Sequence, residues 1–192
     1  MPDLVTVADV SNYTGPISPD QAESLAAAGI EHVIVRISPE SEDLAAITRQ
    51  QLGVLRAAGL AVSGYLFPEY DAAPGESLAR ALGISGPLRT LWIDVEPPGL
   101  PSAVIIRSWI VRAAEASPVP VGVYTSGWVL AQLPGWEPIT LPLWAAAYGE
   151  RPDSLEVAFG GWMRAAGIQY SADVRVGGVL CDLSVFDARA LE

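Results

Sequence analysis

Short apolar runs alternate along the chain with Ala/Leu-rich segments of helical length, and this alternation constrains the fold more than any other feature. Five runs rich in Val, Ile and Leu come first, at residues 4–11, 32–38, 61–68, 90–96 and 119–126. Segments of helical length separate them, at residues 18–29, 42–59, 73–83 and 101–117. Nearly continuous apolar strands between helices are typical of a parallel sheet covered by helices. So many units in one chain favour a closed barrel over an open sheet.

The pattern becomes irregular after about residue 140. Three more strand-like runs follow, at 141–149, 167–173 and 179–187, and between them only residues 161–167 could form a short helical turn. We therefore predict an α/β fold in one domain over residues 1–192: a modified TIM-like barrel of five βα units followed by three β-strands. An open doubly wound sheet is the alternative, but no glycine-rich phosphate loop follows the first strand.

Charge and cysteine content argue against several classes of protein. The formal net charge of −11 disfavours nucleic acid or an anionic membrane as a partner, so a neutral or weakly charged substrate fits better. The single cysteine, Cys181, excludes an intramolecular disulfide and is best explained as a small buried apolar side chain. The N-terminus lacks the basic start and long apolar core of a signal peptide, so we expect a secreted mature form or another route of release.

Two acids lie one residue apart at the end of the fourth apolar run. Side chains alternate along a strand, so Asp94 and Glu96 share one face with Trp92, while the aliphatic neighbours face the helices. Their Cα atoms would lie about 6–7 Å apart, at the strand end that carries the active site in barrels of this kind. Burial of two acids raises the pKa of at least one, which is what a general acid needs near neutral pH.

Other strand ends repeat this feature. Asp9 closes the first strand and Asp182 opens the last. Aromatic and amide side chains accompany them on the intervening strands: Tyr65, Tyr124, Trp144, Tyr148 and Gln169. Several carboxyl groups among Tyr and Trp rings are the lining expected for an oligosaccharide, since rings stack on sugar faces and carboxyl groups act on the glycosidic oxygen.

Taken in order, these segments resemble glycoside hydrolase family 25, the muramidases of the N,O-diacetyl type. The resemblance runs nearly end to end. It rests on "ADVSNYTGPIS" at 8–18, "LWIDVE" at 91–96, "VGVYTSGWVL" at 121–130, "LPLWAAAYG" at 141–149, "IQYS" at 168–171 and "CDLSVF" at 181–186. The fold of that family, five strand-helix units and three further strands, agrees with the count made above.

The resemblance implies a function and a role for each site residue. Glu96 would be the general acid, and Asp94 would stabilise charge at the anomeric centre or orient the 2-acetamido group of the substrate. Asp9 and Asp182 would orient and tune that pair, and Tyr65, Tyr124 and Trp144 would shape the −1 subsite. We expect Tyr148 and Gln169 to bind the substrate as well. The bond cleaved would be the β-1,4 bond between N-acetylmuramic acid and N-acetylglucosamine in peptidoglycan. The resemblance further implies a monomer that acts on the cell wall outside the membrane, without metal or organic cofactor.

The sequence departs from the family pattern at three places. Leu66 stands where the family has His, which would remove a polar group near the site; Ser184 replaces Asn; and the segment at 38–46 is short. Two other functions therefore stay open. One is a non-catalytic or altered-specificity carbohydrate-binding barrel in a phage or surface assembly. The other is a hydrolase of another 2-acetamido polysaccharide such as chitin.

Each site assignment also has a purely structural alternative. The acid pair could cap a strand end or pair with Arg36, Asp9 could cap a turn, and Asp182 could satisfy local backbone N–H groups. The aromatic residues could belong to the core. His32, the only histidine, begins a strand at the end opposite the site, so we expect it to be structural, and a Ser/His/Asp hydrolase is implausible.

Overall fold

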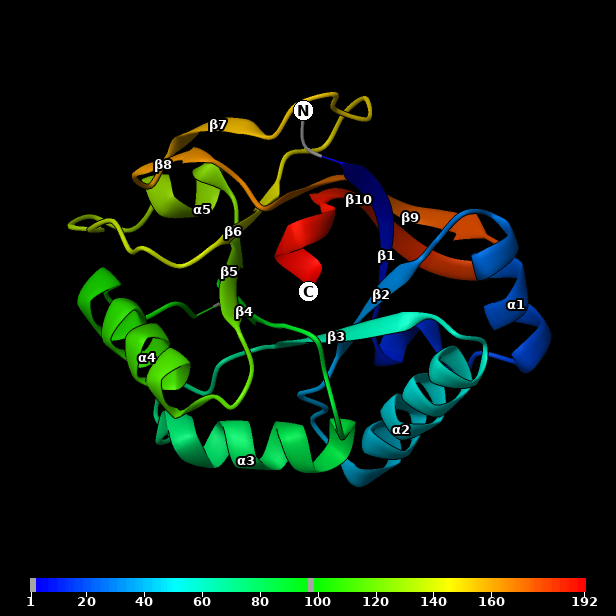
Figure 1. The fold of residues 1–192 in the computed structure, drawn as a ribbon. Helices are drawn as coiled ribbons and strands as arrows, with labels where there is room; N and C mark the ends of the chain where they lie inside the picture. The colour runs from blue at the N-terminus through cyan, green and yellow to red at the C-terminus, as the bar shows by residue number, and fades with distance from the viewer. Residues whose placement is uncertain (1–2, 97–98) are drawn as a thin grey trace.

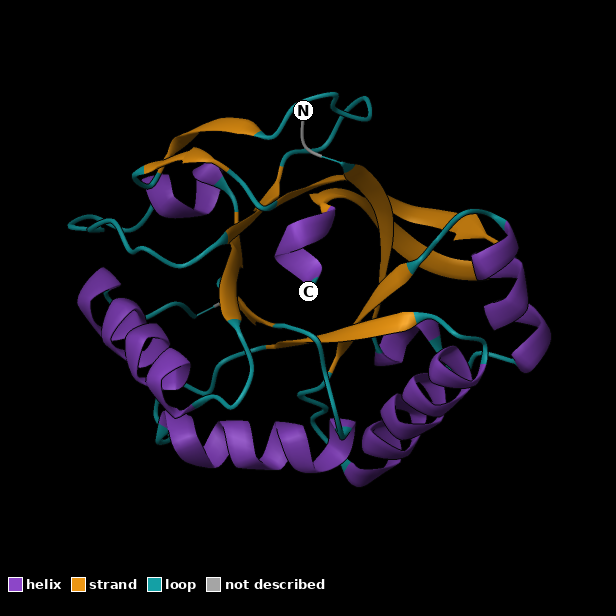
Figure 2. Ribbon diagram, viewed as in Figure 1, coloured by secondary structure: helices purple, strands orange, loops and turns teal. Residues whose placement is uncertain are grey.

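The computed structural model describes residues 3–96 and 99–192, and its main feature is a closed eight-stranded barrel (Figures 1 and 2). The strands follow one another around the barrel in the order β1-β10-β9-β6-β5-β4-β3-β2. Their bounds are β1 (Leu4–Val10), β2 (His32–Arg36), β3 (Ala61–Leu66), β4 (Leu91–Asp94), β5 (Val121–Thr125), β6 (Leu143–Ala146), β9 (Gly167–Val176) and β10 (Val179–Asp187). The predicted α/β barrel is confirmed.

Parallel pairing runs from β1 through β2, β3, β4, β5 and β6 to β9, whereas β10 is antiparallel to both of its neighbours. In the view of Figure 1 the helices surround the barrel from its right, along the bottom, to its upper left. They are α1 (Pro19–Ala27), α2 (Glu42–Ala57), α3 (Pro74–Ser85), α4 (Ala103–Ala116) and α5 (Gly127–Ala131). The count of five βα units followed by three barrel strands is therefore correct. Among the described helices, none has the length and apolarity needed to cross a membrane.

Local sequence signals explain where the helices begin and end. The side chain of Ser18 accepts a hydrogen bond from the backbone N–H of Gln21, and Pro19 occupies the first helical turn of α1. Gly29 and Gly59 follow α1 and α2 with positive φ angles of 86° and 80°, a conformation that glycine adopts without strain. The chain can therefore turn sharply from each of these helices into the next strand.

The short helix suggested at residues 161–167 is wrong. Residues 162–164 form strand β8 (Trp162–Arg164), which pairs with β7 (Glu156–Phe159) in a separate two-stranded sheet. Gly160 and Gly161 make the connecting turn with φ angles of 62° and 91°. Trp162 is buried and donates its indole N–H to the carbonyl of Leu141, and Trp136 donates to the carbonyl of Gly160, so both contacts hold the hairpin against the preceding segment.

Large side chains fill the barrel interior. Seven buried residues form this inner cluster: Val7, Ile34, Trp92, Tyr124, Trp144, Phe186 and Leu191. The ring of Trp92 lies against Gly122 on the neighbouring strand, so close that a Cβ there would come 2.2 Å from the ring. Below this layer, His32 and Ser63 share a 2.8 Å hydrogen bond, and the 3-10 helix η2 (Ala188–Leu191) lies at the centre of the view in Figure 1. Among the described residues, the barrel interior is thus packed with side chains.

Candidate active site

Nine side chains line a small cavity of about 120 Å³ at the carboxyl end of the parallel strands. The lining residues are Asp9, Tyr65, Asp94, Glu96, Tyr124, Trp144, Tyr148, Gln169 and Asp182. They come from β1, β3, β4, β5, β6, β9, β10 and the segments that follow β4 and β6. The structure therefore brings together every residue that the sequence nominated for the site.

The acid pair is held by the neighbouring strand β5. Asp94 is paired in register with Tyr124, and the backbone N–H of Val95 donates to the Tyr124 carbonyl at 2.9 Å. The hydroxyl of Thr125 in turn donates to the Val95 carbonyl at 3.0 Å. Asp94 is only 4% exposed, and its Oδ1 is buried without a hydrogen-bond partner among the described residues. Glu96, one step further out, is half-buried, so the two acids have different environments.

Asp9 and Asp182 face each other across the antiparallel pair of β1 and β10, where they are register partners. Asp182 does not open the last strand, as the sequence suggested, but lies within β10, close to an irregularity between Cys181 and Leu183. Because β10 runs antiparallel to its neighbours, its N-terminal half reaches the same rim as the ends of the parallel strands. The Oδ1 of Asp182 accepts a 2.8 Å hydrogen bond from the backbone N–H of Asp173.

Burial and mutual repulsion raise the pKa of all four carboxyl groups. For Asp9, burial first and the charge of Asp182 second raise the pKa to about 8, although a hydrogen bond from Gln169 opposes the shift. Burial and then Glu96 raise the pKa of Asp94 well above its ordinary value. Burial also raises the pKa values of Glu96 and Asp182. The cavity therefore holds carboxyl groups that keep a proton closer to neutral pH, as general acids must.

Replacing Asp9 with asparagine should stabilise the fold at neutral and alkaline pH. Between pH 3.8 and about 8, the folded protein binds a proton at Asp9 that the unfolded chain has released. The protonated Asp9 therefore contributes stability that is fully present below pH 3.8 and is lost as the pH rises through about 8. We expect Asp9→Asn to raise the free energy of unfolding by about 1–2 kcal/mol at pH 8. Urea denaturation at pH 4 and pH 8 tests this, because the difference between variant and wild type should nearly disappear at pH 4.

The aromatic residues divide into buried and exposed members. Trp144 is 2% exposed, packs on Tyr124 at a ring-centroid distance of 4.4 Å and donates its indole N–H to the Ser184 hydroxyl at 3.0 Å. Trp144 is therefore both a core residue and a lining residue of the cavity. Ser184, which stands where the family has Asn, accepts the hydrogen bond that holds the Trp144 indole. Tyr148 is 63% exposed and anchored only by its hydroxyl, which leaves its ring free to face a ligand.

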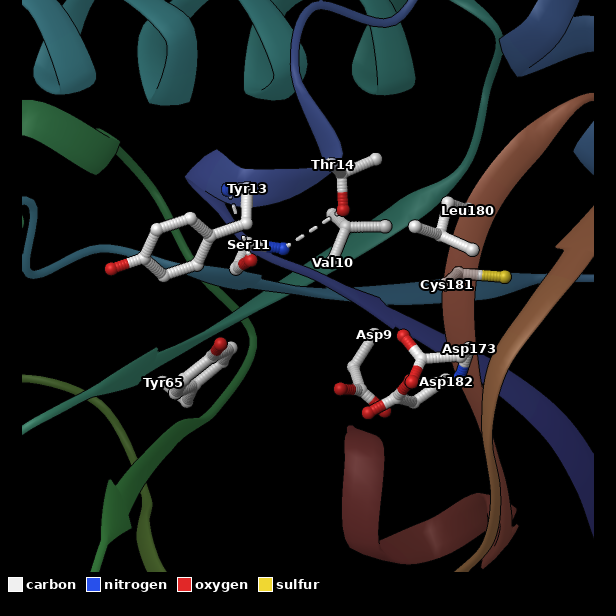
Figure 3. Close-up of a pocket in the computed structure, with 10 residues that line it drawn as sticks. All are labelled: Asp9, Val10, Ser11, Tyr13, Thr14, Tyr65, Asp173, Leu180, Cys181 and Asp182. Carbon is white, nitrogen blue, oxygen red and sulfur yellow. Dashed lines mark hydrogen bonds between the residues drawn. The ribbon is translucent and has the colours of Figure 1, made fainter.

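A second cavity of about 230 Å³ adjoins the first and shares Asp9, Tyr65 and Asp182 with it (Figure 3). Figure 3 shows the carboxyl groups of Asp9, Asp173 and Asp182 gathered on one side and Tyr65 on the other. Sequence analysis missed Asp173 and Tyr13 as lining residues. Asp173 has a positive φ of 55°, a conformation that aspartate adopts more often than most residues. Its position within an apparent strand gave no sign that it would line the site.

A third cavity, of about 490 Å³, lies on the other side of Glu96 and has a largely apolar lining that includes Phe67, Leu100 and Ile105. Glu96 lines both this cavity and the central one, and the central cavity shares three lining residues with the second, so the central cavity adjoins both of the others. This arrangement could hold several sugar units, with the four carboxyl groups near its middle.

The structural alternatives can now be compared with the geometry. Arg36 pairs with Glu40 at 2.6 Å rather than with the acid pair. His32 borders a different cavity, at the opposite end of the barrel. Leu66 packs in the layer between the barrel and the helices. A leucine at this position in place of the family histidine therefore removes no side chain from the lining of the cavity. Cys181 is buried, as expected, and its sulfur points away from the three carboxyl groups in Figure 3.

Comparison with known proteins identifies the architecture. No protein-family model and no curated protein sequence matches the chain. Solved structures do: a family GH25 lysozyme from Aspergillus fumigatus aligns with a TM-score of 0.78 and 18% identity over 97% of this chain and 95% of that one. A bacterial lysozyme from Streptomyces coelicolor aligns with a TM-score of 0.74 and 21% identity over 97% and 94%. The chain has the fold of the family 25 lysozymes.

The same family 25 lysozyme fold occurs in the modular Cpl-1 endolysin, whose structure was solved with a peptidoglycan analogue. That match has a TM-score of 0.62 and 17% identity and covers 97% of this chain but 55% of the longer endolysin. The resemblance seen in the sequence is thus confirmed at the level of fold. At such identities the roles of individual residues rest on the geometry of this site.

Proposed function

We propose that this protein is a peptidoglycan hydrolase that cleaves the β-1,4 bond between N-acetylmuramic acid and N-acetylglucosamine. The observation that carries the proposal is the meeting of Asp94 and Glu96 in one aromatic-walled cavity where burial raises the pKa values of both. Glycosidases need one carboxylic acid to protonate the leaving oxygen and a second group to stabilise the sugar cation. The lysozyme fold, shared over nearly the whole chain, supports the same conclusion.

In this proposal Glu96 is the general acid. It is the more accessible member of the pair, so its proton can reach the glycosidic oxygen, and burial keeps that proton bound at higher pH. Asp94 stabilises the anomeric centre, either directly or by orienting the 2-acetamido group. The second role is supported by the unpartnered Oδ1 of Asp94, because an amide N–H of the substrate would satisfy this buried acceptor.

The other site residues support these two. Asp9 and Asp182 orient and electrostatically tune that pair, and Tyr65, Tyr124 and Trp144 bound the subsite that holds the ring. Tyr148 offers its exposed ring as a stacking surface. In this proposal the protein acts as a monomer on the cell wall, outside the membrane, and needs neither metal nor organic cofactor.

The test is to digest purified peptidoglycan, reduce the products with borohydride and identify the new reducing ends. The proposal requires muramitol, the reduced form of muramic acid. New glucosaminitol alone would show cleavage of the other glycosidic bond and would contradict it. Pull-down of intact peptidoglycan in the same buffer separates a hydrolase from a barrel that only binds: retention without any new reducing ends would favour the binding function.

Hydrolysis of another 2-acetamido polysaccharide is the second candidate, and one observation favours it. The cavity in Figure 3 has three carboxyl groups and no basic side chain among its lining residues, which suits a neutral sugar better than the lactyl carboxylate of muramic acid. Soluble chitin derivatives should therefore be assayed beside peptidoglycan. Faster release of reducing ends from chitin would assign the protein to this second class.

A further inference from the structure

The amide of Gln169 is the centre of the hydrogen-bond network in the site. Its Oε1 accepts hydrogen bonds from the hydroxyls of Tyr124 and Tyr148, at 2.7 and 2.9 Å. Its Nε2 lies 3.2 and 3.1 Å from the two carboxyl oxygens of Asp9 and 3.2 Å from Oδ2 of Asp182. A glutamine amide offers two N–H donors and two acceptor lone pairs, and here protein groups use all four.

This saturation changes the role assigned to Gln169 by the sequence. Gln169 was nominated as a substrate-binding residue, and it does line the cavity, but it is 2% exposed and has no free polar group to offer a ligand. The two tyrosine hydroxyls also fix which way the amide points. If the amide were flipped, its oxygen would face the Asp9 and Asp182 carboxyl groups and repel them when they are ionised.

We propose that Gln169 is a positioning residue: its amide, locked in orientation by Tyr124 and Tyr148, holds Asp9 and Asp182 together and sets the protonation of this pair. Removal of the amide would leave the two carboxyl groups to repel each other in a buried place. Tyr124 also lies beside the proposed acid, because it lines the same cavity as Glu96 and is the register partner of Asp94. Gln169 thus bonds Asp9 and Asp182 directly and, on its other side, bonds the tyrosine that packs beside Asp94 and Glu96.

Other charged and titratable groups face this network from every neighbouring strand and must be counted in any pH effect. They are Arg36 on β2, Tyr65 on β3, Asp94 and Glu96 at the end of β4, Tyr124 on β5, Tyr148 after β6, Asp173 on β9, and Cys181 and Asp182 on β10. Of the groups that act on Asp9, only the amide of Gln169 lowers the pKa of this carboxyl group, whereas burial, Asp182 and Glu96 raise it. Substitution of Gln169 therefore has a definite predicted direction.

The experiment is an NMR titration of the Asp9 carboxyl carbon in uniformly ¹³C-labelled protein. In the wild type we expect a midpoint near 8. In Gln169→Met, which keeps the length of the side chain but has no N–H donor, the midpoint should rise by about one to two pH units. Gln50→Met is the matched control, because Gln50 bonds only the backbone of Ile17, and it should leave the midpoint unchanged.

A second variant guards against the case in which Gln169→Met does not fold. Tyr148→Phe keeps Gln169 and removes one of the two hydroxyls that orient its amide, at a ring that is largely exposed. A smaller rise of the Asp9 midpoint is expected there. An unchanged midpoint in Tyr148→Phe, or in a folded Gln169→Met, would overturn the proposal and leave Gln169 a packing residue.

The titration needs no catalytic turnover, so it can be interpreted even if the proposed function fails. Where the protein does hydrolyse a polysaccharide, the inference makes one further prediction that rests on that function. The pH–rate profile of Gln169→Met should move in the same direction as the Asp9 midpoint, with a larger change in kcat than in KM. A loss of activity that is uniform across pH would contradict a role in setting protonation.

Discussion

Glu96→Gln is expected to lower the rate of glycosidic bond cleavage by about 10²–10⁴-fold, the usual contribution of a general acid. Glutamine has nearly the same shape as glutamic acid but no proton to donate to the leaving oxygen. Because Glu96 is half-buried and its pKa is raised, removal of its charge should leave the fold intact or slightly more stable. Reducing-end release across pH 4 to 8, with circular dichroism as the folding check, measures both effects.

Glu69→Gln is the matched control for this prediction. Glu69 lines the neighbouring cavity but is exposed and paired with Arg80, so its substitution should change the rate less than a few-fold. A Glu96→Gln variant that kept most of the activity would show that another carboxyl group is the acid. The adjacent Asp94, whose pKa is also raised, would then be the first candidate.

Gly122→Ala is expected to destabilise the protein by about 3 kcal/mol or to prevent folding, the largest effect on stability that we predict. The added methyl group would lie 2.2 Å from the Trp92 ring. That ring cannot move away freely, because it also packs edge-on against Trp144 and Phe186, with ring-centroid distances of 6.0 and 5.5 Å. Urea denaturation followed by far-UV circular dichroism measures the loss.

Gly53→Ala is the control, since Gly53 lies inside α2 with nothing within 4 Å of its would-be Cβ. Alanine should stabilise this exposed helical position by about 0.5–1 kcal/mol. If Gly122→Ala were instead as stable as the wild type, the Trp92 ring would have to occupy another place. Its fluorescence spectrum would then change, and the described packing of the barrel interior would be wrong.

The barrel strands were predictable because each is a short apolar run with a helix or a turn signal on either side. The ends of β2, β3 and β10 agree with the prediction within two residues. The β7–β8 hairpin has a local signal, the Gly160-Gly161 pair between two short runs, but the prediction of a helical turn at 161–167 gave this turn signal no weight. The fifth βα unit was predicted without a residue range for its helix, because the five residues of α5 carry too little periodicity to place it.

The site was predictable as a set of residues, although its internal connections were not. Parallel strand ends meet at one rim, so carboxyl and aromatic residues at those ends had to meet as well. The function of Gln169 depends on partners from four other parts of the chain, namely Asp9, Tyr124, Tyr148 and Asp182. No spacing in the sequence shows which lone pair of an amide accepts which hydrogen bond.

The antiparallel pairing of β1 with β10 also determines when the barrel can close. During synthesis β1 leaves the ribosome with one edge unpaired and can pair with β10 only after all the intervening strands have been made, so this contact is the one of greatest sequence separation in the barrel. The same pairing brings the two ends close together, with the N–H of Ala188 bonded to the carbonyl of Asp3 at 2.9 Å. A short linker could therefore join Asp3 to Ala188. A circular permutant opened in a surface loop between two βα units should form the same barrel, with β1 and β10 now neighbours in the sequence.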